Sequence, residues 1–415
     1  MIVVGLLSGT SMDGLDAAVA EIEIADGVVR LTPLGAHPTP WSPRLRDRLL
    51  AVLPPGRTTV AEVCALDTLV GQAAAAAADA ALNALGRPGD LVSWLGQTVF
   101  HWVRDGEALG SLQLGQPAWI AERTGVAVVS DLRSTDIAAG GHGAPLASTL
   151  DALWLAGPRR RAALNLGGIA NITVVGRPGE PVVSFDTGPG NCLLDVLATR
   201  TVTGPGAGPA TGPGTDGDAP GYDVDGALAA AGTVDPALLA ELLAEKYYAA
   251  EPPKSTGREL FTADYLDSAV DSALIAARER GHGTRRAPNP TAPDIAATLV
   301  ALTARTVADA CARYGVTEVV GSGGGMHNPV LVGALRAALG PVPLRRSDEL
   351  GLPVDAKEAY LTALLGALSW HGVPGVLPGA TGSRVPRVLG RFSPGHRPLR
   401  LPDPAGPVHT LQITR

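Results

Sequence analysis

The stretch from residue 2 to residue 24 constrains the fold of this chain more than any other. An apolar run from Ile2 to Leu7 enters it, and a second run from Leu15 to Ile24 leaves it. Between the runs lie glycine, serine, threonine and aspartate residues, interrupted only by Met12. Apolar runs of this kind are typical of strands, and the polar residues between them are typical of a turn. The segment therefore predicts two strands joined by a polar turn.

The residue types in this turn favour phosphate binding. Gly9 and Gly14 let a ligand approach the backbone closely, and the N–H groups beside them can converge on an anion. Asp13 and Asp16 are suited to hold a divalent metal, directly or through water. The alternative is an ordinary β-hairpin turn that binds nothing. The hydroxyl residues between the glycines, at the very start of a domain, favour the phosphate site.

Length and charge exclude several classes of protein. A chain of 415 residues predicts two domains, and 46% hydrophobic residues suffice to bury their cores. The net charge of −7 argues against nucleic acid as a partner, because the sequence has no basic stripe to neutralise phosphates. No positively charged leader precedes the first strand, and no apolar run approaches the ~18 residues of a membrane span. We therefore expect a cytoplasmic protein with no membrane partner.

The order of the motifs predicts two domains of similar build. Residues 1–138 with 372–415 are expected to form the first domain, and residues 139–371 the second. Residues 162–175 repeat the strand, glycine turn and strand of the opening segment, and two halves facing each other across a cleft would explain the repeat. Residues 203–220 are rich in glycine and proline, which predicts a flexible surface insertion. The tail from Pro374 is expected to pack along the surface.

Local signals place several further elements. Residues 59–85 predict a long alanine-rich helix, capped near Thr59 and closed by Gly86. Leu91 to Leu95 predicts a short strand that delivers a loop ending at His101. We expect His101 and His142, both in glycine-bearing loops, to be structural donors more often than catalytic bases.

Asp186 is the best candidate for a catalytic carboxylate. It follows a predicted buried strand over residues 182–185 and precedes a Gly-Pro-Gly turn, so it is held in place and is not free on a surface. The alternative is an aspartate that caps the helix beginning near Asn191.

A glycine loop at residues 321–325 predicts a nucleotide site. It follows a strand over 317–320 and precedes Asn328 and Pro329, which predict the start of a helix. N–H groups at a helix N-terminus suit a nucleotide, and the alternative is a tight turn between strand and helix. The loop lacks the third glycine of a dinucleotide fingerprint, and the chain contains no P-loop motif.

Several cations in loops or at helix starts are suited to meet a phosphate or a carboxylate-bearing substrate. Each has the alternative of a surface charge or an ion pair, and two acidic neighbours carry the same alternative. These cations are Arg133, Lys254, Arg258 and Lys357, and the acidic neighbours are Glu259 and Glu358.

Taken together, these motifs resemble the anhydro-N-acetylmuramic acid kinase family of the sugar kinase/actin/Hsp70 superfamily. The matching stretches follow the family's order from residue 5 to about residue 370. Each stretch alone is weakly specific, but the whole series in order is specific. They are Ser8–Asp16, Gly96-Gln97-Thr98, Asp136-Ile137-Ala138 with Gly140–Leu146, Asn165–Asn171, Asp186-Thr187-Gly188-Pro189-Gly190-Asn191, Lys254-Ser255-Thr256-Gly257-Arg258-Glu259, and Gly323-Gly324-Gly325 with Asn328.

The resemblance implies an α/β fold of two ribonuclease H-like domains that close around ATP, Mg²⁺ and a cell-wall amino sugar. Water opens the 1,6-anhydro bridge of that sugar while its O6 receives the γ-phosphoryl group, giving N-acetylmuramic acid 6-phosphate for peptidoglycan recycling. In the family, the aspartate at the position of Asp186 is the base that acts on the water. A homodimer is one possible assembly.

The expected contacts divide into a nucleotide set and a sugar set. For ATP they are Gly9, Thr10, Ser11, Met12, Asp13, Gly14, Leu15, Asp16, Asn165, Gly167, Gly168, Gly323, Gly324, Gly325 and Asn328, with Asp13 as the expected metal ligand. For the sugar they are Gln97, Thr98, Arg133, Gly188, Pro189, Asn191 and Glu358.

The chain departs from the family pattern at three places. Leu95 stands where the family usually has histidine, His142 stands where it often has glutamine, and residues 203–220 are extra. The first two departures leave open a kinase for another small sugar or polyol. A third hypothesis, a non-catalytic nucleotide or sugar sensor, is disfavoured because Asp186 and both glycine loops are retained.

Overall fold

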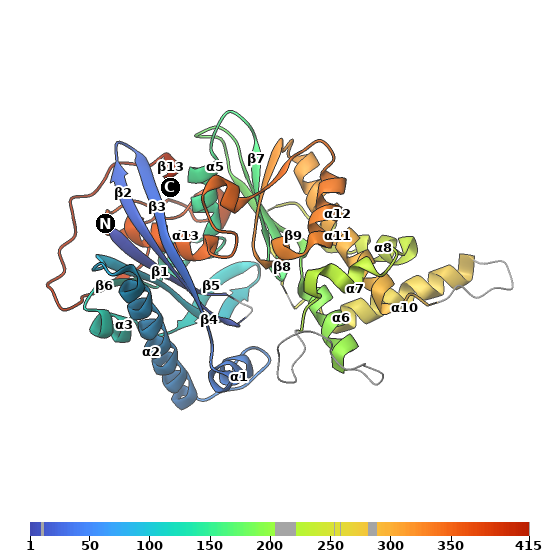
Figure 1. The fold of residues 1–415 in the computed structure, drawn as a ribbon, viewed down its shortest axis with the longest axis horizontal. Helices are drawn as coiled ribbons and strands as arrows, with labels where there is room; N and C mark the ends of the chain where they lie inside the picture. The colour runs from blue at the N-terminus through green and yellow to red at the C-terminus, as the bar shows by residue number, and fades with distance from the viewer. Residues whose placement is uncertain (10–11, 204–220, 253, 258, 281–288, 415) are drawn as a thin grey trace. The chain divides into compact units, whose positions relative to one another are not determined.

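The computed structural model describes residues 1–415 except 10–11, 204–220, 253, 258, 281–288 and 415. The described chain divides into two compact units (Figure 1). Unit 1 consists of residues 1–158, 175–182 and 347–415, and unit 2 consists of residues 159–174 and 183–346.

Unit 1 is built on a mixed sheet with the strand order β12-β6-β4-β1-β2-β3-β13, and β5 pairs with β4. The strand β2 runs antiparallel to both β1 and β3, whereas β4 and β6 continue parallel to β1. Its elements are β1 (Ile2–Ser8), β2 (Gly14–Ala25), β3 (Val28–Pro40), α1 (Pro43–Ala51), α2 (Val60–Leu85), β4 (Leu91–Arg104), β5 (Glu107–Leu114), α3 (Pro117–Thr124), β6 (Ala127–Ser130), α4 (Ser134–Ala138), α5 (Ala147–Leu155), η3 (Ser347–Leu350), α13 (Lys357–Trp370), α14 (Pro378–Thr381), β12 (Arg391–Ser393) and β13 (Thr410–Ile413).

Both faces of this sheet are buried, as the opening apolar run requires. Because successive side chains of a strand point to opposite faces, β1 feeds two hydrophobic clusters. Val3 and Leu7 pack in a cluster with α5 and α13, while Val4 and Leu6 pack in a cluster with α2 and α3. The predicted strand, turn and strand over residues 2–24 is thus confirmed, with β1 and β2 paired in antiparallel register.

The C-terminal tail corrects an expectation. The sequence predicts a tail that packs along the surface, but β12 pairs antiparallel with β6 and β13 pairs parallel with β3. These short strands therefore extend the sheet at both edges. Pairing of this kind supplies hydrogen-bond partners to edge strands that would otherwise be exposed.

Unit 2 is built on a second mixed sheet, with the strand order β11-β10-β7-β8-β9. Its α11 begins with a capping box between Thr291 and Asp294 and packs against α12, α7 and α8. The elements are β7 (Arg161–Leu166), β8 (Ile169–Val175), β9 (Val183–Pro189), α6 (Cys192–Thr203), η1 (Val224–Gly226), α7 (Ala227–Ala230), α8 (Pro236–Leu243), α9 (Lys246–Ala249), α10 (Ala263–Arg280), α11 (Ala292–Arg313), β10 (Glu318–Ser322), η2 (Gly324–His327), α12 (Pro329–Leu339) and β11 (Leu344–Arg346).

The two sheets repeat one topology. In unit 1 the strands β3-β2-β1 are followed by the parallel strands β4 and β6, and in unit 2 β9-β8-β7 are followed by the parallel strands β10 and β11. The repeat predicted from residues 162–175 is therefore confirmed, because β7 and β8 hold the places of β1 and β2. The fold is α/β, built from two units that share this ribonuclease H-like strand order.

The unit boundaries differ from those expected at residues 138 and 371. Both α5 and α13 lie in unit 1, since α13 packs on β1, β2 and β4 and α5 contacts β13 and α13. Residues 139–158 and 347–371 therefore belong to unit 1 and not to the second half. The insertion expected at 203–220 lies, from residue 204 on, outside the described residues.

The segment after Leu95 also differs from expectation. Gly96 to His101 is not a loop, because β4 continues to Arg104 and pairs with β5 in a long hairpin. Gly96 has a φ of 82°, a value that glycine adopts without strain, and the register of this hairpin shifts between Thr98 and Phe100.

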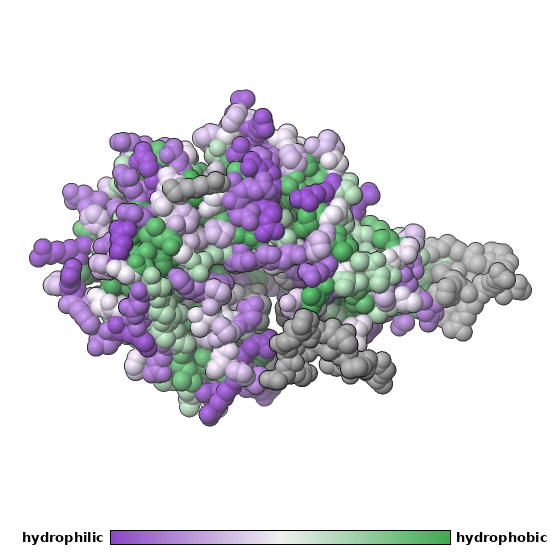
Figure 2. Space-filling model, viewed as in Figure 1, coloured by the Kyte–Doolittle hydropathy of each residue, from purple (hydrophilic) through white to green (hydrophobic). Residues whose placement is uncertain are grey.

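Among the described residues, two helices are long and apolar enough to cross a membrane by length and composition alone. They are α2 and α11, and 33% and 56% of their most apolar windows are buried. The space-filling view shows apolar residues over α2 (Figure 2). The sequence-based expectation that no segment approaches a membrane span does not hold for these two helices by length and composition. The finding is weak support for a membrane, because the core helices of soluble proteins pass the same test.

The packing of α13 on β1 gives a stability prediction. A methyl group on Gly5 would collide with the backbone carbonyl of Ala359 and the backbone nitrogen of Ala363, neither of which can rotate away. We expect Gly5→Ala to lower the free energy of unfolding by about 1–3 kcal/mol or more. Gly333→Ala is the matched control, because no atom lies near that site on α12 and alanine favours a helix. Chemical denaturation measures both, and equal midpoints for the two variants would contradict the close packing.

Candidate functional site

Hydrogen bonds with Gln97 fix the start of the turn between β1 and β2. The Ser8 hydroxyl donates to Gln97 Oε1 at 2.5 Å and Gln97 Nε2 donates to the carbonyl of Gly9 at 3.3 Å. Gln97 is fully buried, and its neighbour Thr98 accepts a hydrogen bond from Gln113 at 3.3 Å. The structure therefore brings together the Gly-Gln-Thr stretch and the turn, while contact of Gln97 or Thr98 with a sugar stays a prediction.

Within the turn, side chains and backbone have different environments. Met12 and Leu15 are each 1% exposed and belong to the core of unit 1, so only their backbone can face a ligand. Met12 has a φ of 51° and its N–H donates to the carbonyl of Gly9 at 3.3 Å, which makes a tight turn. Thr10 and Ser11 lie outside the described residues.

Carboxylates gather beside this turn. The pKa of Asp16 is raised to about 6, chiefly by burial and then by the neighbouring charges of Asp13, Glu358 and Asp355. Mutual repulsion of this kind is relieved when a cation binds. No group of three or more His, Cys, Asp or Glu side chains in the described chain is arranged to hold a metal ion. A Mg²⁺ ion that takes only one or two carboxylates and completes its shell with phosphate and water remains compatible with Asp13 and Asp16.

Arg133 and Glu358 form a second charged group in unit 1. One guanidinium nitrogen of Arg133 donates to the carbonyl of Gly143 at 2.6 Å, while its Nε is buried with no hydrogen-bond partner in the described structure. Burial lowers the pKa of Arg133 and raises that of Glu358, and the opposite charge of each counteracts the shift of the other. A buried guanidinium with an unused N–H is suited to bind a carboxylate.

A buried ion pair fixes the start of α13, where Glu358 lies. Lys357 Nζ lies 2.6 Å from Asp151 Oδ1, and the two side chains are 7% and 3% exposed. Lys357 also stacks 5.9 Å from the centroid of the Trp154 ring. Of the two alternatives for Lys357, a ligand contact or an ion pair, the structure therefore shows an ion pair within unit 1.

The two departures from the family pattern lie in different environments. Leu95 is 7% exposed and packs in the cluster with α13, so a side chain there faces the core. His142 is exposed, and its backbone N–H donates to the carbonyl of Thr381 at 2.9 Å. His101 has its pKa lowered by burial and by the nearby charges of Arg133 and His142, so the neutral form is favoured.

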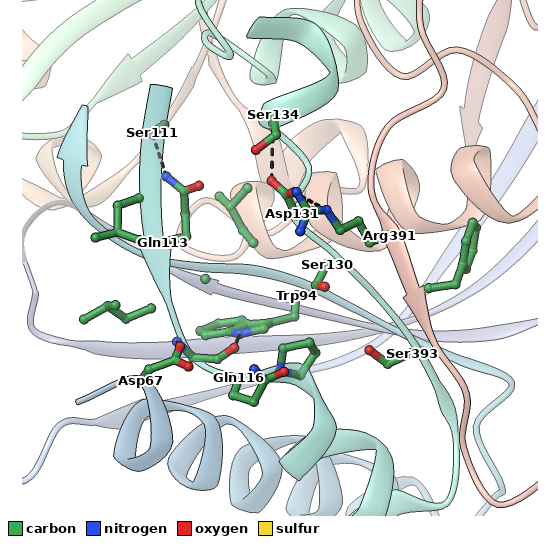
Figure 3. A pocket seen from close by; sticks show the side chains of 17 residues that line it. Asp67, Trp94, Ser111, Gln113, Gln116, Ser130, Asp131, Ser134, Arg391 and Ser393 are labelled. Atoms are coloured by element: carbon green, nitrogen blue, oxygen red, sulfur yellow. Dashed lines mark hydrogen bonds and ion pairs between the residues drawn. The ribbon is translucent and has the colours of Figure 1, made fainter. Parts of the chain in front are cut away.

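Unit 1 contains a pocket of about 500 Å³ beside the β4–β5 hairpin (Figure 3). Asp131 is central to its polar wall: its carboxylate accepts from the Ser134 N–H at 3.3 Å and pairs with Arg391 at 2.8 Å. Across the pocket, Trp94 Nε1 donates to the carbonyl of Gly115 at 2.7 Å. The described lining residues include Leu95 and Gly96 but none of the expected sugar contacts.

In unit 2, Asp186 lies within β9 and not after it, because the strand continues to Pro189. Its side chain is half-buried, and Oδ2 accepts a hydrogen bond from the Thr256 N–H at 2.9 Å. Burial raises the pKa of Asp186, the Thr256 bond opposes this rise and the charge of Glu259 adds to it, and the net result is a pKa of about 6. The bond to Thr256 argues against the alternative of an aspartate that caps α6.

The residues after Asp186 join the strands of unit 2. The Asn191 side-chain amide donates to the carbonyls of Leu166 and Gly167 at 3.3 and 3.2 Å, and its backbone N–H donates to Gly167 at 2.9 Å. A methyl group on Gly188 would lie 2.8 Å from the Tyr248 ring, so Gly188 permits close packing. Asn191 therefore clamps the Gly167–Gly168 turn, whereas sugar contacts of Gly188, Pro189 and Asn191 stay predictions.

The glycine loop packs against the end of β7. Gly323 has a φ of 88°, and a methyl group there would lie 2.5 Å from Asn165 Oδ1. Gly324 faces open space, so a ligand can approach its backbone. The Asn328 side chain caps α12 by accepting from the N–H groups of Val330 and Leu331 at 3.0 and 3.1 Å, as the sequence predicts.

Sequence reasoning missed the partners of Asp186. The sequence suggests Lys254 and Arg258 as cations for a phosphate or a carboxylate, and Arg258 lies outside the described residues. Lys254 Nζ instead donates to the carbonyls of Tyr247 and Tyr248 at 3.0 and 3.3 Å. The adjacent Tyr247-Tyr248 pair ahead of this stretch is the only sequence signal, because two consecutive aromatic residues in a polar segment indicate local packing.

The comparisons with known proteins place this chain in a family. The family model described as anhydro-N-acetylmuramic acid kinase matches residues 1–395. Proteins named anhydro-N-acetylmuramic acid kinase are 48% identical in Streptomyces coelicolor (100% of this chain and 99% of that protein), 50% identical in Streptomyces avermitilis (98% and 97%) and 48% identical in Rhodococcus erythropolis (96% and 96%). Among solved structures, xylulose kinase from Rhodospirillum rubrum aligns over 89% of this chain and 90% of its own, with 15% identity and a TM-score of 0.41. On the family model and the full-length relatives, the chain belongs to the anhydro-N-acetylmuramic acid kinase family.

Proposed function

We propose that this chain is an ATP-dependent kinase that opens 1,6-anhydro-N-acetylmuramic acid with water and phosphorylates its O6. The products are N-acetylmuramic acid 6-phosphate and ADP, an activity that serves peptidoglycan recycling. The observation that carries the proposal is the environment of Asp186: a half-buried carboxylate with one oxygen fixed by the Thr256 N–H and a pKa of about 6. A base with a pKa near the working pH is suited to take a proton from water. Use of ATP as donor fits a cytoplasmic location.

The proposed reaction couples one bond cleavage to one transfer. Asp186 takes a proton from the attacking water, whose oxygen bonds to the anomeric carbon C1. The C1–O6 bond breaks, and its electron pair stays on O6. O6 then bonds to the γ-phosphorus while the bond to the β–γ bridging oxygen breaks and ADP leaves. Transfer to phosphorus thus stabilises the departing oxygen without a separate general acid.

The turn between β1 and β2 is proposed to hold the phosphates. Gly9 and Gly14 offer backbone approach, and the cluster of Asp13 and Asp16 is proposed to hold Mg²⁺ through one or two carboxylates. Bound there, Mg²⁺ would supply charge neutralisation on the phosphate oxygens. Phosphoryl transfer depends mostly on such positioning and charge, which backbone N–H groups also supply.

The remaining contacts are proposed to fix the nucleoside and the sugar. The Gly323–Gly325 loop is proposed to pass along the adenosine, because Gly324 faces open space and its neighbours pack too closely for side chains. Arg133 is proposed to bind the lactyl carboxylate, because its Nε is buried with no partner in the described structure. Glu358, on the first turn of α13, is proposed to accept from sugar hydroxyls.

A panel of sugars tests the substrate. We expect ADP release with the anhydro sugar and a product with phosphorus on O6, detected by coupled assay and phosphorus NMR. N-acetylmuramic acid without the bridge should give little turnover, because its O6 carries a proton and the proposed base acts on the water at C1 and not on O6. Turnover with N-acetylmuramic acid but none with the anhydro sugar would contradict the proposed reaction, and turnover with another polyol alone would favour the second hypothesis.

Asp186→Asn tests the base. The amide cannot accept the proton, so we expect turnover to fall by roughly 10²- to 10⁴-fold while ATP still binds. Asp271→Asn on α10 is the matched control, since Asp271 is exposed in the same unit. Steady-state kinetics and titration with a fluorescent ATP analogue separate the two effects. A wild-type rate in Asp186→Asn would remove Asp186 from this role.

The pH dependence of kcat/KM gives an independent test. Asp186 acts only as a carboxylate, so activity should fall as the pH drops through the pKa of about 6 that its burial causes. An aspartate with the ordinary pKa would instead place this limb near ~4. Because Asp16 also has a pKa of about 6, the profile is repeated in Asp16→Asn, where the limb should remain. A limb near 4 in the wild type would contradict the role of Asp186.

A further inference from the structure

Three residues outside β9 form hydrogen bonds with Asp186. The Tyr247 hydroxyl donates to the Asp186 backbone carbonyl at 2.7 Å, and the Asp186 N–H donates to the Lys254 carbonyl at 3.4 Å. The Thr256 N–H holds the carboxylate at 2.9 Å. Tyr247, Lys254 and Thr256 therefore contact the carbonyl, the N–H and the side chain of the same residue.

The Lys254 ammonium connects these contacts. It donates to the carbonyls of Tyr247 and Tyr248 at the end of α9 and lies 4.6 Å from the centroid of the Tyr247 ring. It also lies 5.7 Å from the ring of Phe185, the residue before Asp186. A cation at such distances is attracted to the faces of aromatic rings and to the carbonyls at a helix end. The ammonium thus draws α9, β9 and the 254–256 segment together.

A packed aromatic group supports this arrangement. Phe261 is 1% exposed and lies 6.3 Å from the rings of both Tyr247 and Tyr248. Burial raises the pKa of Tyr247 well above its usual range, with the charge of Asp186 as a second cause. Tyr247 therefore keeps its proton and remains a hydrogen-bond donor at any working pH.

We propose that Tyr247 and Lys254 are positioning residues that hold the Thr256 N–H on Asp186 Oδ2 and so leave the other carboxylate oxygen to take the proton from water. We name these residues with Thr256 the Lys254 latch. The inference rests on the proposed role of Asp186 as base. It assigns the charge of Lys254 to the geometry of the base, and not to binding a phosphate or a carboxylate.

The charges around the latch fix the direction of its effect. The Thr256 bond stabilises the carboxylate and lowers the pKa of Asp186, whereas burial and Glu259 raise it. Lys254 itself has a pKa lowered by burial and by Arg313 and raised by Glu251, and its two carbonyl acceptors favour the ammonium form. Loosening the latch should therefore move the base out of line and raise the pKa of Asp186.

Lys254→Met, Lys254→Arg and Tyr247→Phe test the latch in the full-length enzyme. For Lys254→Met we expect kcat to fall by roughly ten- to a hundredfold, as a small misplacement of a reacting group does. The acid limb of kcat/KM should move to higher pH, and KM for ATP should be unchanged. Tyr247→Phe should shift both quantities in the same direction by less, and Lys254→Arg should restore part of the loss.

Matched controls separate this role from a general loss of structure. Lys246→Met changes an exposed lysine beside Tyr247, and Tyr265→Phe removes a hydroxyl that bonds Leu242 and not Asp186. Both should keep the wild-type rate and acid limb. Thermal unfolding shows which variants are folded, and if Lys254→Met does not fold, Tyr247→Phe decides alone.

Two results would overturn the latch. One is a folded Lys254→Met or Tyr247→Phe variant that keeps the wild-type kcat and acid limb. The other is a Lys254→Met variant in which only a KM rises, which would make Lys254 a substrate contact. Failure of the latch is distinguishable from failure of the proposed function. In the first case the wild type turns over the anhydro sugar and Asp186→Asn does not, and in the second the wild type has no such turnover.

Discussion

The close contact between β1 and α13 is the constraint on which unit 1 depends. Gly5 has no side chain, so the backbone of α13 at Ala359 and Ala363 lies directly on the strand. One end of β1 leads into the turn that is proposed to hold the phosphates, and the first turn of α13 carries Glu358. The contact therefore holds the helix that carries Glu358 against the strand that leads to the turn, and the charge of Glu358 adds to the rise in the pKa of Asp16 that burial mainly causes.

Unit 2 meets a different physical requirement, since a base must be both charged and poorly solvated. Burial alone would favour protonated Asp186, and the single N–H of Thr256 opposes it. The balance leaves the pKa at about 6, where the carboxylate is present at neutral pH yet still has affinity for a proton. A more strongly hydrogen-bonded carboxylate would be a weaker base, and a more deeply buried one would be neutral.

Local sequence pattern was sufficient for the elements that depend on near neighbours. The β1–β2 turn, the long helix α2 with its caps at Thr59 and Gly86, and the Asn328 cap of α12 follow from residue types within a few positions. The repeated strand order was also visible, because each unit begins with the same strand, turn and strand. The family motifs added the nature of the reaction, which fold alone does not determine.

What the sequence could not predict depends on partners far along the chain. The tail strands β12 and β13 are short and weakly patterned, and they form because β6 and β3 offer unpaired edges. Asp186 and Thr256 lie 70 residues apart, so no local signal joins them. Lys254 illustrates the same limit: a loop cation looks available for a ligand until its carbonyl acceptors are known.

The central claim is that water attacks the sugar carbon while O6 attacks phosphorus. Turnover of ATP and the anhydro sugar in water enriched with ¹⁸O, with prompt mass analysis of the product, tests it most directly. The account predicts one ¹⁸O on the anomeric carbon and none in the phosphate group. Label in the phosphate, or a phosphorylated product that keeps its anhydro bridge, would contradict it.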